Sequence, residues 1–443
     1  MKYKYKYKHL VIFLILISFI FNTSCSGGKK FKESEAGKKE ITIYILCSKD
    51  ASRYSFAWGS YDGIKVNPVY FNNDLEKLQN ELYVELMVAE GPDVVCTTDD
   101  RTTNIVKSVY KLANSNTFID LNPYIKADKT YKASDYNKLI MDSGIFNGKR
   151  LFIPRLYDVP ALTTTKEKLE ENNIKISGDR WSWEEMISVC KKFINDKKDK
   201  RQALIFDTDN QLFIDMVANS RIGFIDFETK STKFNSLDFV NLLKDYKNYI
   251  YPAIMKDNNS NEKALEADSN LSIIKSSPTL GDPLDYVDYM GDEKNAIPFL
   301  LPSYGNGDVI GVAREMFGIT SKCKYKQAAY DFIQNIVKST YMNIGVMPLE
   351  GVPVYKPLFN EKMGAVEGKV KLTVIGMHPT RVLNSYEDNF FNIISDNVSE
   401  VRLNDKTIND MITSAVDKYI RGSITAEQAS IEIDRKAKLF LNE

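Results

Sequence analysis

The chain has 443 residues, which is enough for two or three domains at roughly 150 residues each. Apolar residues make up 43% and aromatic residues 12%, so the chain can bury sizeable cores and does not have the composition of a disordered protein. Lysine plus arginine and aspartate plus glutamate both number 59, a balance that argues against a nucleic-acid-binding protein.

The amino terminus is typical of an export signal. Four lysines and no acidic residue accompany the apolar run VIFLILISFIF, which is short for a membrane span of about 20 residues but suits a signal sequence. Small residues then precede Cys25, as in a lipoprotein signal, although Asn22 stands where an aliphatic residue is usual. We expect removal of residues 1–24, lipidation of Cys25 and a flexible tether over 25–40. An ordinary secretory signal or an uncleaved anchor is the alternative.

Strand-like and helix-like segments alternate after the tether. The run ITIYIL (41–46) is continuously apolar and β-branched, as in a central strand that is covered on both faces. Residues 74–88 place leucines on one helical stripe, Gly91 and Pro92 end this helix, and DVVC (93–96) predicts the next strand. This order predicts a parallel sheet, with ligand sites at the carboxyl ends of its strands.

Later helices are predicted from their start signals. Ser182 and Glu185 have the spacing of a capping box, and an amphipathic helix follows them. Residues 324–337 repeat the amphipathic pattern. Thr425 and Gln428 form a second capping box, which predicts a final helix that runs to the carboxyl terminus.

Seven segments stand in a distinctive order along the chain: GPDVV (91–95), FIDLNPYI (118–125), NGKRLFIPRLYDVPAL (147–162), WSWEEM (181–186), the strand and helix of 227–249, the helix of 324–337 with GVMPLEGVPVYK (345–356), and ITAEQA (424–429). Each segment alone is a weak signal. Their order, behind a lipoprotein-like leader, resembles the extracellular solute-binding proteins of ABC importers, family 1, the group of maltose-type and other sugar-binding lipoproteins.

The resemblance implies an α/β, two-lobed periplasmic-binding-protein-like fold of the class II type, with a hinge of several chain crossings. By analogy, lobe one holds residues 40–154 and 312–345, and lobe two holds residues 155–311 and 346–443. A mono- or oligosaccharide would bind between the lobes, and the permease would recognise their closure. We therefore expect an extracytoplasmic, monomeric protein that is anchored to the cell membrane through Cys25, without a cofactor and without a nucleic-acid partner.

The first candidate site residues follow the predicted strands of lobe one. Lys49 and Asp50 come after the first strand, and Asp100 and Arg101 match an Asp-Arg pair of the maltose-type proteins. A carboxylate accepts hydroxyl donors and an arginine offers a rigid fork of donors, so both suit a polyhydroxylated ligand. The alternative is that Asp50 and Asp100 are loop or helix N-cap residues.

Further candidates lie where the chain first crosses between the lobes. Arg155, Tyr157 and Asp158 follow a strand-like run. Tyr157 could stack on the apolar face of a sugar, and Asp158 could accept its hydroxyl groups. Hinge packing with a local salt bridge is the alternative for these three residues.

The segment 277–286 of lobe two lies where many family members have a tryptophan that stacks on sugar, and this chain has no tryptophan there. Asp282 and Tyr286 are the nearest substitutes, and Tyr304 lies in a glycine-rich turn that precedes the second crossing. The tryptophans of the capping segment, Trp181 and Trp183, are expected to be structural.

Signs of catalysis and of metal binding are weak. The chain has only His9 and His378, and it has no P-loop, dinucleotide fingerprint or nucleophile elbow. The segment 207–213 begins like a calcium loop but lacks the required glycine and the final glutamate. The mature cysteines other than Cys25 show no zinc-like spacing, so we expect four buried thiols. The sequence therefore favours a binding protein over an enzyme. The alternatives to a carbohydrate receptor are a receptor for a non-sugar solute, a secreted carbohydrate-processing enzyme and an adhesive lipoprotein.

Overall fold

The computed structural model describes residues 39–46, 64–88, 90–98, 103–176, 181–196, 203–207, 212–256, 272–276, 281–290, 294–304, 309–338, 351–368 and 381–443. The chain divides into two units, Met1–Lys38 and Lys39–Glu443, and every described residue belongs to the second. The expected signal sequence, Cys25 and nearly all of the tether therefore lie outside the described residues. Within the described ranges, no helix is both long and apolar enough to cross a membrane.

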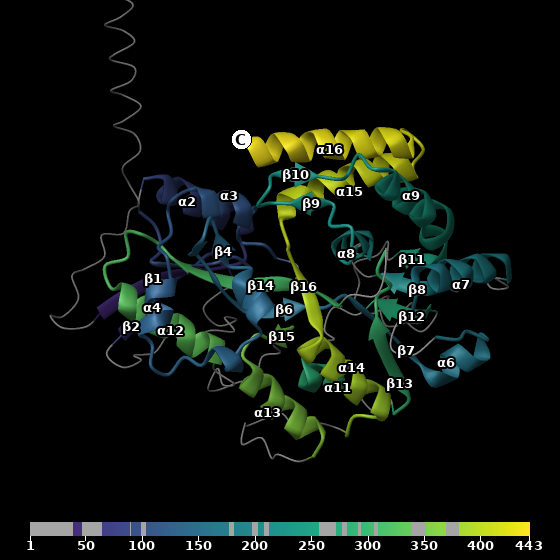
Figure 1. The fold of residues 1–443 in the computed structure, drawn as a ribbon, viewed down its shortest axis with the longest axis horizontal. Helices are drawn as coiled ribbons and strands as arrows, with labels where there is room; N and C mark the ends of the chain where they lie inside the picture. Colours follow the sequence, from purple (N-terminus) through teal and green to yellow (C-terminus); the bar gives the residue numbers. More distant parts are fainter. Residues whose placement is uncertain are drawn as a thin grey trace, which may run out of the picture. The chain divides into compact units, whose positions relative to one another are not determined.

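A seven-stranded sheet combines strands from residues 39–158 with strands from residues 309–403 (Figure 1). Its order is β15-β6-β14-β3-β1-β2, and β16 pairs beside β14. The strand β1 is parallel to β2 and β3, whereas β14 is antiparallel to β3 and β6 and parallel to β16. The strands are β1 (Lys39–Ile45), β2 (Ile64–Tyr70), β3 (Val94–Cys96), β6 (Ile153–Asp158), β14 (Val309–Ile319), β15 (Val352–Pro353) and β16 (Val398–Leu403).

The β-α-β order predicted for the beginning of the fold is confirmed. Between β2 and β3 runs α2 (Leu75–Met87), which buries the leucine stripe of Leu78, Leu82 and Leu86. Gly91 then adopts φ +87°, in the left-handed region that favours glycine, and a Cβ there would lie 3.1 Å from the Cβ of Glu85. Glycine thus allows the tight return from α2 into β3.

A five-stranded sheet with the order β11-β8-β12-β7-β13 is formed by strands from residues 161–300. The strand β8 is parallel to β11 and β12, and β7 is antiparallel to β12 and β13. The strands are β7 (Ala161–Thr165), β8 (Ala203–Asp207), β11 (Ile254–Lys256), β12 (Ser272–Ser276) and β13 (Ala296–Leu300). The helices that pack around this sheet are α6 (Lys166–Glu171), α7 (Trp183–Asp196), α8 (Leu212–Ala218), α9 (Leu237–Asp245), α15 (Lys406–Ile420) and α16 (Ala426–Asn442).

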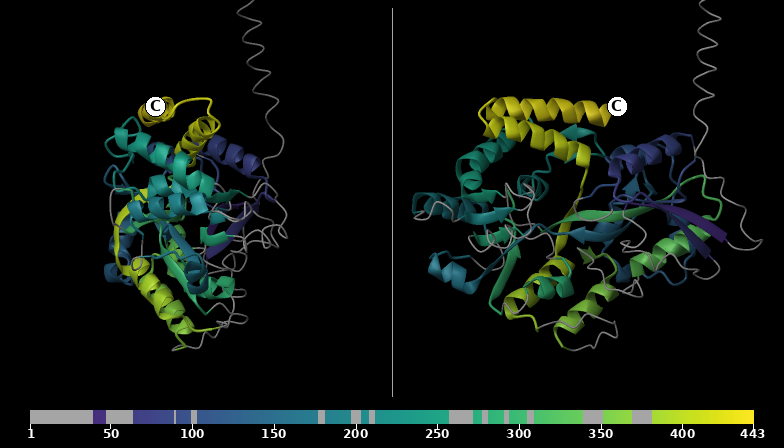
Figure 2. Two further views of the ribbon diagram at one scale, coloured as in Figure 1. Left: turned by 90° about the vertical axis from the view of Figure 1, so that its right-hand side faces the viewer. Right: turned by 180° about the vertical axis from the view of Figure 1, so that it is seen from behind.

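Both predicted capping boxes are confirmed at helix starts. Before α7, the N–H of Ser182 donates to Glu185 and the N–H of Glu185 donates to the Ser182 hydroxyl. Before α16, Thr425 and Gln428 make the same reciprocal pair. Figure 2 shows α15 and α16 side by side in two further views, which agrees with their contacts with each other and with those of α16 with α9.

The smaller elements connect or cover the sheets. The helices are α3 (Val109–Asn114), α4 (Asn122–Ala127), α5 (Lys138–Asp142), α11 (Pro283–Met290), α12 (Lys326–Lys338), α13 (Lys356–Val366) and α14 (Ser385–Asp396), and short helical turns cover Ala133–Asp135, Tyr246–Ile250 and Tyr251–Ala253. Two hairpins pair β4 (Ile145–Phe146) with β5 (Lys149–Arg150) and β9 (Ile225–Asp226) with β10 (Ser231–Thr232).

Among the described elements, the chain passes from the seven-stranded to the five-stranded sheet between β6 and β7, returns between β13 and β14, and passes from β16 to α15 of the second apolar cluster. Each of the two sheets has a large cluster of buried apolar residues around it. Pairing places β15 and β16 in the seven-stranded sheet. The exact lobe boundaries, 40–154 with 312–345 and 155–311 with 346–443, stay a prediction.

Candidate functional site

The loops expected to bind solute follow the carboxyl ends of the parallel strands. The predicted residues Lys49, Asp50, Asp100 and Arg101 follow β1 and β3, and all four lie outside the described residues. Their contact with solute stays a prediction. The described residues nearest to them in sequence show how the end of β3 is held.

The end of β3 is tied to β14 by threonine hydroxyl groups. The hydroxyl oxygens of Thr97 and Thr98 accept the backbone N–H groups of Met316 and Glu315, each at 3.1 Å. The N–H of Thr97 also donates to the carbonyl of Met316 at 3.0 Å. Both threonines are buried, so the chain that leads to Asp100 starts from a fixed position.

A buried ion pair joins the two crossing strands. Arg155 of β6 and Glu315 of β14 lie 2.7 Å apart, and the two residues are only 2% and 0% exposed. Glu315 also has φ +44°, in the left-handed region that residues other than glycine rarely adopt. It lies where the neighbour of β14 changes from β16 to β3. Backbone strain of this kind persists only where the surrounding contacts hold it in place.

A second ion pair lies one position away on β14. Arg314 donates to Asp158 at 2.9 Å; the Arg314 side chain is buried, whereas that of Asp158 is 12% exposed at the end of β6. A Cβ on Gly351 would lie 3.2 Å from the Asp158 carboxylate, so the approach of β15 requires a small residue here. Sequence analysis missed Arg314 and Glu315. Their signal is two adjacent charges inside the otherwise apolar run VIGVAREMFGI (309–319).

Other predicted residues are engaged within the protein. The hydroxyl of Tyr157 donates to the carbonyl of Ile394 at 2.9 Å, and burial raises the pKa of this tyrosine. Arg155 and Asp158 are engaged by the salt bridges described above. Contact of these three residues with solute stays a prediction.

The candidates of the second lobe are also packed. Asp282 forms a buried ion pair with Lys362 of α13. The ring of Tyr286 is buried, and that of Tyr304 packs edge-on against Trp183 at 5.1 Å. The predicted structural role of Trp183 is consistent with its burial. A role in solute binding for Asp282, Tyr286 and Tyr304 remains to be tested.

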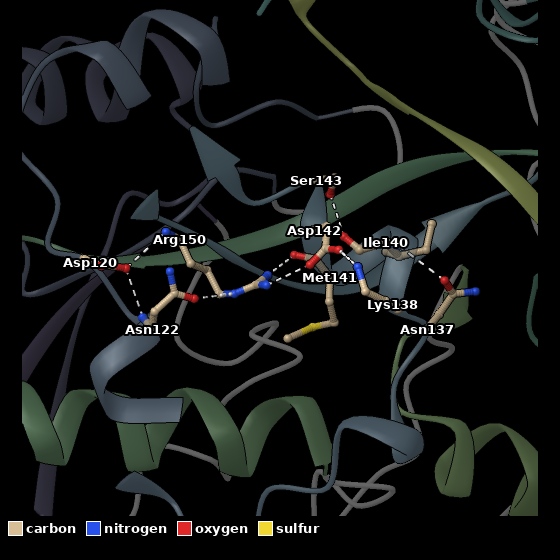
Figure 3. Close-up of polar contacts among 9 residues, drawn as sticks. All are labelled: Asp120, Asn122, Asn137, Lys138, Ile140, Met141, Asp142, Ser143 and Arg150. Atoms are coloured by element: carbon tan, nitrogen blue, oxygen red, sulfur yellow. Dashed lines mark hydrogen bonds and ion pairs between the residues drawn. The ribbon is translucent and has the colours of Figure 1, made fainter. Parts of the chain in front are cut away.

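The segment that enters β6 is anchored by a polar network (Figure 3). Arg150 contacts Asp142 at 2.9 Å and Asn122 at 3.3 Å, while the Asp120 carboxylate accepts the N–H of Arg150 at 3.1 Å. Burial tends to raise the pKa of Asp142, but hydrogen bonds from Lys138 and Arg150 outweigh it, so this pKa lies below its ordinary value. The network fixes the start of the strand that carries Arg155 and Asp158.

A groove of about 960 Å³ lies along one side of β16. Its walls come from α3, α5, the β4–β5 hairpin and residues 221–233. Charges of both signs line it, among them Asp142, Arg221, Glu400 and Arg402. The described solute-contact candidates, Arg155, Tyr157, Asp158, Asp282, Tyr286 and Tyr304, are not among its described lining residues.

The described ranges contain no group of three or more His, Cys, Asp or Glu residues able to hold a metal ion. Three of the four cysteines expected to be buried thiols, Cys96, Cys190 and Cys323, are buried and free. Burial raises the pKa of the Cys190 thiol to about 12, which makes it a poor nucleophile. Cys47 lies outside the described residues.

The fold is shared with solved solute-binding proteins. The ABC substrate-binding protein Lmo0181 of Listeria monocytogenes, in complex with cycloalternan, matches at 15% identity and TM-score 0.64 over 91% of this chain and 99% of that one. The sugar-binding protein MalE of Xanthomonas citri matches at 16% identity and TM-score 0.65 over 91% and 98%. The GacH receptor of Streptomyces glaucescens, solved unliganded and with acarbose, matches at 14% identity and TM-score 0.62 over 92% and 99%. The predicted two-lobed α/β fold is thereby confirmed.

The sequence itself matches a protein family. No curated protein sequence matches the chain. The family model described as bacterial extracellular solute-binding protein matches residues 59–358, which is well over half of the chain. The chain therefore belongs to the bacterial extracellular solute-binding proteins.

Proposed function

We propose that this protein is a lipid-anchored receptor that binds a carbohydrate between its two lobes and delivers it to an ABC importer. The observation that carries the proposal is the family match over residues 59–358. Structures of the same fold in complex with cycloalternan and acarbose support a carbohydrate as the solute. The leader that precedes Cys25 supports lipid anchoring.

The proposed solute site lies at the carboxyl ends of β1 and β3 in one lobe and of β8 and β12 in the other. Lys49, Asp50, Asp100 and Arg101 supply charged donors and acceptors for hydroxyl groups. Asp158, partly exposed at the first crossing, adds an acceptor. The ion pairs behind it, including Arg155 with Glu315, hold the crossing strands so that this acceptor keeps its direction.

Binding shifts the protein toward a closed form because the solute contacts both lobes only there. A solute that favours the closed form stabilises the folded protein by RT ln(1 + [L]/Kd). Capture of the solute by lobe closure requires no covalent chemistry, in keeping with the proposed receptor role.

A thermal-shift screen against mono- and oligosaccharides tests the proposed solute class. At least one carbohydrate should raise the melting temperature without being converted, as checked by chromatography of the sugar. The variant Asp100→Asn should weaken that binding at least tenfold, whereas the control Asp410→Asn, on the exposed surface of α15, should not. Turnover of the sugar would support the enzyme alternative, and stabilisation by amino acids or peptides alone would support a non-sugar solute.

Membrane anchoring needs a separate experiment. In cells that express the full chain, the protein should fractionate with membranes and incorporate labelled palmitate, and Cys25→Ser should abolish both. Membrane association that survives this substitution would instead indicate an uncleaved anchor. Release of the wild-type protein into the medium would indicate an ordinary secretory signal.

A further inference from the structure

The start of α11 lies against the start of β15 through two glycines. A Cβ on Gly281 would lie 2.6 Å from the carbonyl carbon of Gly351 and 2.6 Å from the backbone nitrogen of Val352. Real Cβ atoms essentially never come within 3.0 Å of other heavy atoms, so the two backbones are in direct contact and only glycine fits at position 281. We call this contact the glycine seam.

The glycine seam lies beside a predicted solute contact. A Cβ on Gly351 would lie 3.2 Å from the Asp158 carboxylate and 3.2 Å from the carbonyl of Tyr157. Val352 pairs with Tyr157, so β15 runs beside the end of β6. Gly351 therefore lies against both Gly281 and Asp158, and a displacement at Gly281 reaches the Asp158 carboxylate through a single glycine.

A buried ion pair holds the residue that follows Gly281. Asp282 is 0% exposed and Lys362 of α13 is 4% exposed, and the Lys362 ammonium group contacts the Asp282 carboxylate. The other carboxylate oxygen of Asp282 accepts the N–H of Leu284 at 3.0 Å, and its carbonyl accepts the N–H of Tyr286 at 2.9 Å. Asp282 thus acts as a helix cap and, at the same time, ties the start of α11 to α13.

The same helices are also held by apolar contacts that do not involve the ion pair. Helix α11 packs on α13 (Figure 1). The ring of Phe391 in α14 lies 5.4 Å from that of Tyr286 in α11 and 6.5 Å from that of Phe359 in α13. Apolar contacts have no preferred direction, whereas a buried charge is tolerated only opposite its partner. The rings therefore hold the helices together, and the ion pair fixes where α11 starts.

We propose that Lys362 is a positioning residue for solute binding. Through Asp282 it keeps the glycine seam closed, and the seam keeps the start of α11 in a fixed position relative to the Asp158 carboxylate. Both members of the ion pair are buried, so their role is to hold the site rather than to touch the solute. The inference rests on the proposed function, because it concerns the same solute site.

Calorimetric binding of acarbose, cycloalternan and maltose, at a temperature where every variant is fully folded, tests the proposal. For each sugar that the wild type binds, Lys362→Met should weaken the affinity about five- to tenfold, because the solute must then order a loosened site. The matched control is Lys166→Met, which removes a lysine that lies 3.8 Å from Glu170 on the exposed surface of α6. This control should leave the affinity unchanged.

A double variant separates positioning from stability. Lys362→Met leaves the Asp282 carboxylate buried without its cation and should also lower the denaturation midpoint. Adding Asp282→Asn removes the charge but keeps a good helix cap, so the midpoint should recover while the affinity stays low. Ile433→Ala, in the buried cluster around the five-stranded sheet, should lower the midpoint without weakening the affinity. Recovery of affinity together with stability in the double variant overturns the positioning role.

Amide hydrogen exchange without solute completes the test. The N–H of Tyr286 donates to the Asp282 carbonyl, so it should exchange several times faster in Lys362→Met and in Gly281→Ala, while α15 is unaffected. Unchanged exchange at residues 281–287 overturns the proposal, and so does a Lys362→Met variant that binds a sugar as tightly as the wild type. If the wild type binds no carbohydrate, the proposed function and this role in it fall together, and the exchange alone shows whether Lys362 holds the seam.

Discussion

Aromatic rings pack in the cores around both sheets of the molecule, but buried ion pairs join strands of only one of them among the described residues. In the five-stranded sheet, aromatic rings fill the core, as where Trp181 packs edge-on against Phe299 at 5.2 Å. In the seven-stranded sheet, β6 and β14 are joined by the buried pair of Arg155 with Glu315 and, beside it, by that of Arg314 with Asp158.

Apolar contacts and buried ion pairs contribute differently: the first mainly stabilise the fold, and the second mainly fix the register of the strands that they join. Apolar contacts stabilise without a preferred direction, and similar volumes can replace one another. A buried charge is tolerated only opposite its partner, so an ion pair penalises any other register of the strands that carry it. We infer that the charges lie on β6 and β14 because the chain crosses between the lobes at the ends of these strands.

Removing one buried charge should give the largest effect. Glu315→Ala leaves the Arg155 guanidinium without its carboxylate and should lower the free energy of unfolding by about 3–5 kcal/mol, as measured by urea denaturation. The double variant Arg155→Met with Glu315→Leu should regain most of this stability, because neither charge then remains. A double variant as unstable as the single one would contradict this account of the pair.

An apolar truncation in the other sheet should cost somewhat less. Leu162 lies fully buried in β7, and Leu162→Ala should lower the free energy of unfolding by about 3 kcal/mol through the lost contacts and the cavity left behind. Leu162→Met keeps most of the volume and should lose less than about 1.5 kcal/mol. Equal losses for the two variants would mean that packing volume does not govern this core.

A helix cap at the edge of the five-stranded sheet should contribute less again. The Asn384 side chain caps α14 and donates to the carbonyl of Ala296 in β13 at 2.8 Å. Asn384→Ala should lower the free energy of unfolding by about 1 kcal/mol. Asn384→Asp keeps the cap but loses the donor to β13, so an intermediate loss is expected from thermal unfolding; a larger loss than for alanine would contradict the capping role.

The smallest effect should come from the partly exposed carboxylate of Asp142. Its pKa lies below the ordinary value, so its stabilising contribution is present above about pH 3.9 and is lost as the pH falls through the folded-state value. Asp142→Asn should therefore melt below the wild type at pH 7, and the difference between the two melting temperatures should shrink as the pH falls below about 3.9. A difference in melting temperature that does not change with pH would mean that the charge plays no part.

Local signals account for the parts of the fold that sequence analysis predicted. The helix stop at Gly91 and Pro92 and the two capping boxes each lie within a few residues, and the physical cause lies in the same few residues. The position of β14 has no such signal. It separates β3 from β6 by pairing with residues that lie about 150 to 220 positions earlier in the chain.

For the candidate site too, local features could be predicted from the sequence, whereas contacts between distant residues could not. The order of strands predicts which loops follow their carboxyl ends, but not that Arg155 and Asp158 would find partners in Glu315 and Arg314. The hydrogen bond from the Ser108 hydroxyl to the Asp405 carboxylate is a further example. Asp405 has the composition of an N-cap, yet nothing near it in the sequence indicates that Ser108 is its neighbour.

The central place of β14 also affects how an exported chain can fold. A chain that leaves the membrane amino terminus first presents β3 and β6 long before residues 309–319 arrive to separate and pair them. The last strand of the sheet, β16, comes only at residues 398–403. Nearly the whole polypeptide must therefore cross the membrane before all seven strands can pair. Until then, the edges of the strands already present can pair with other chains.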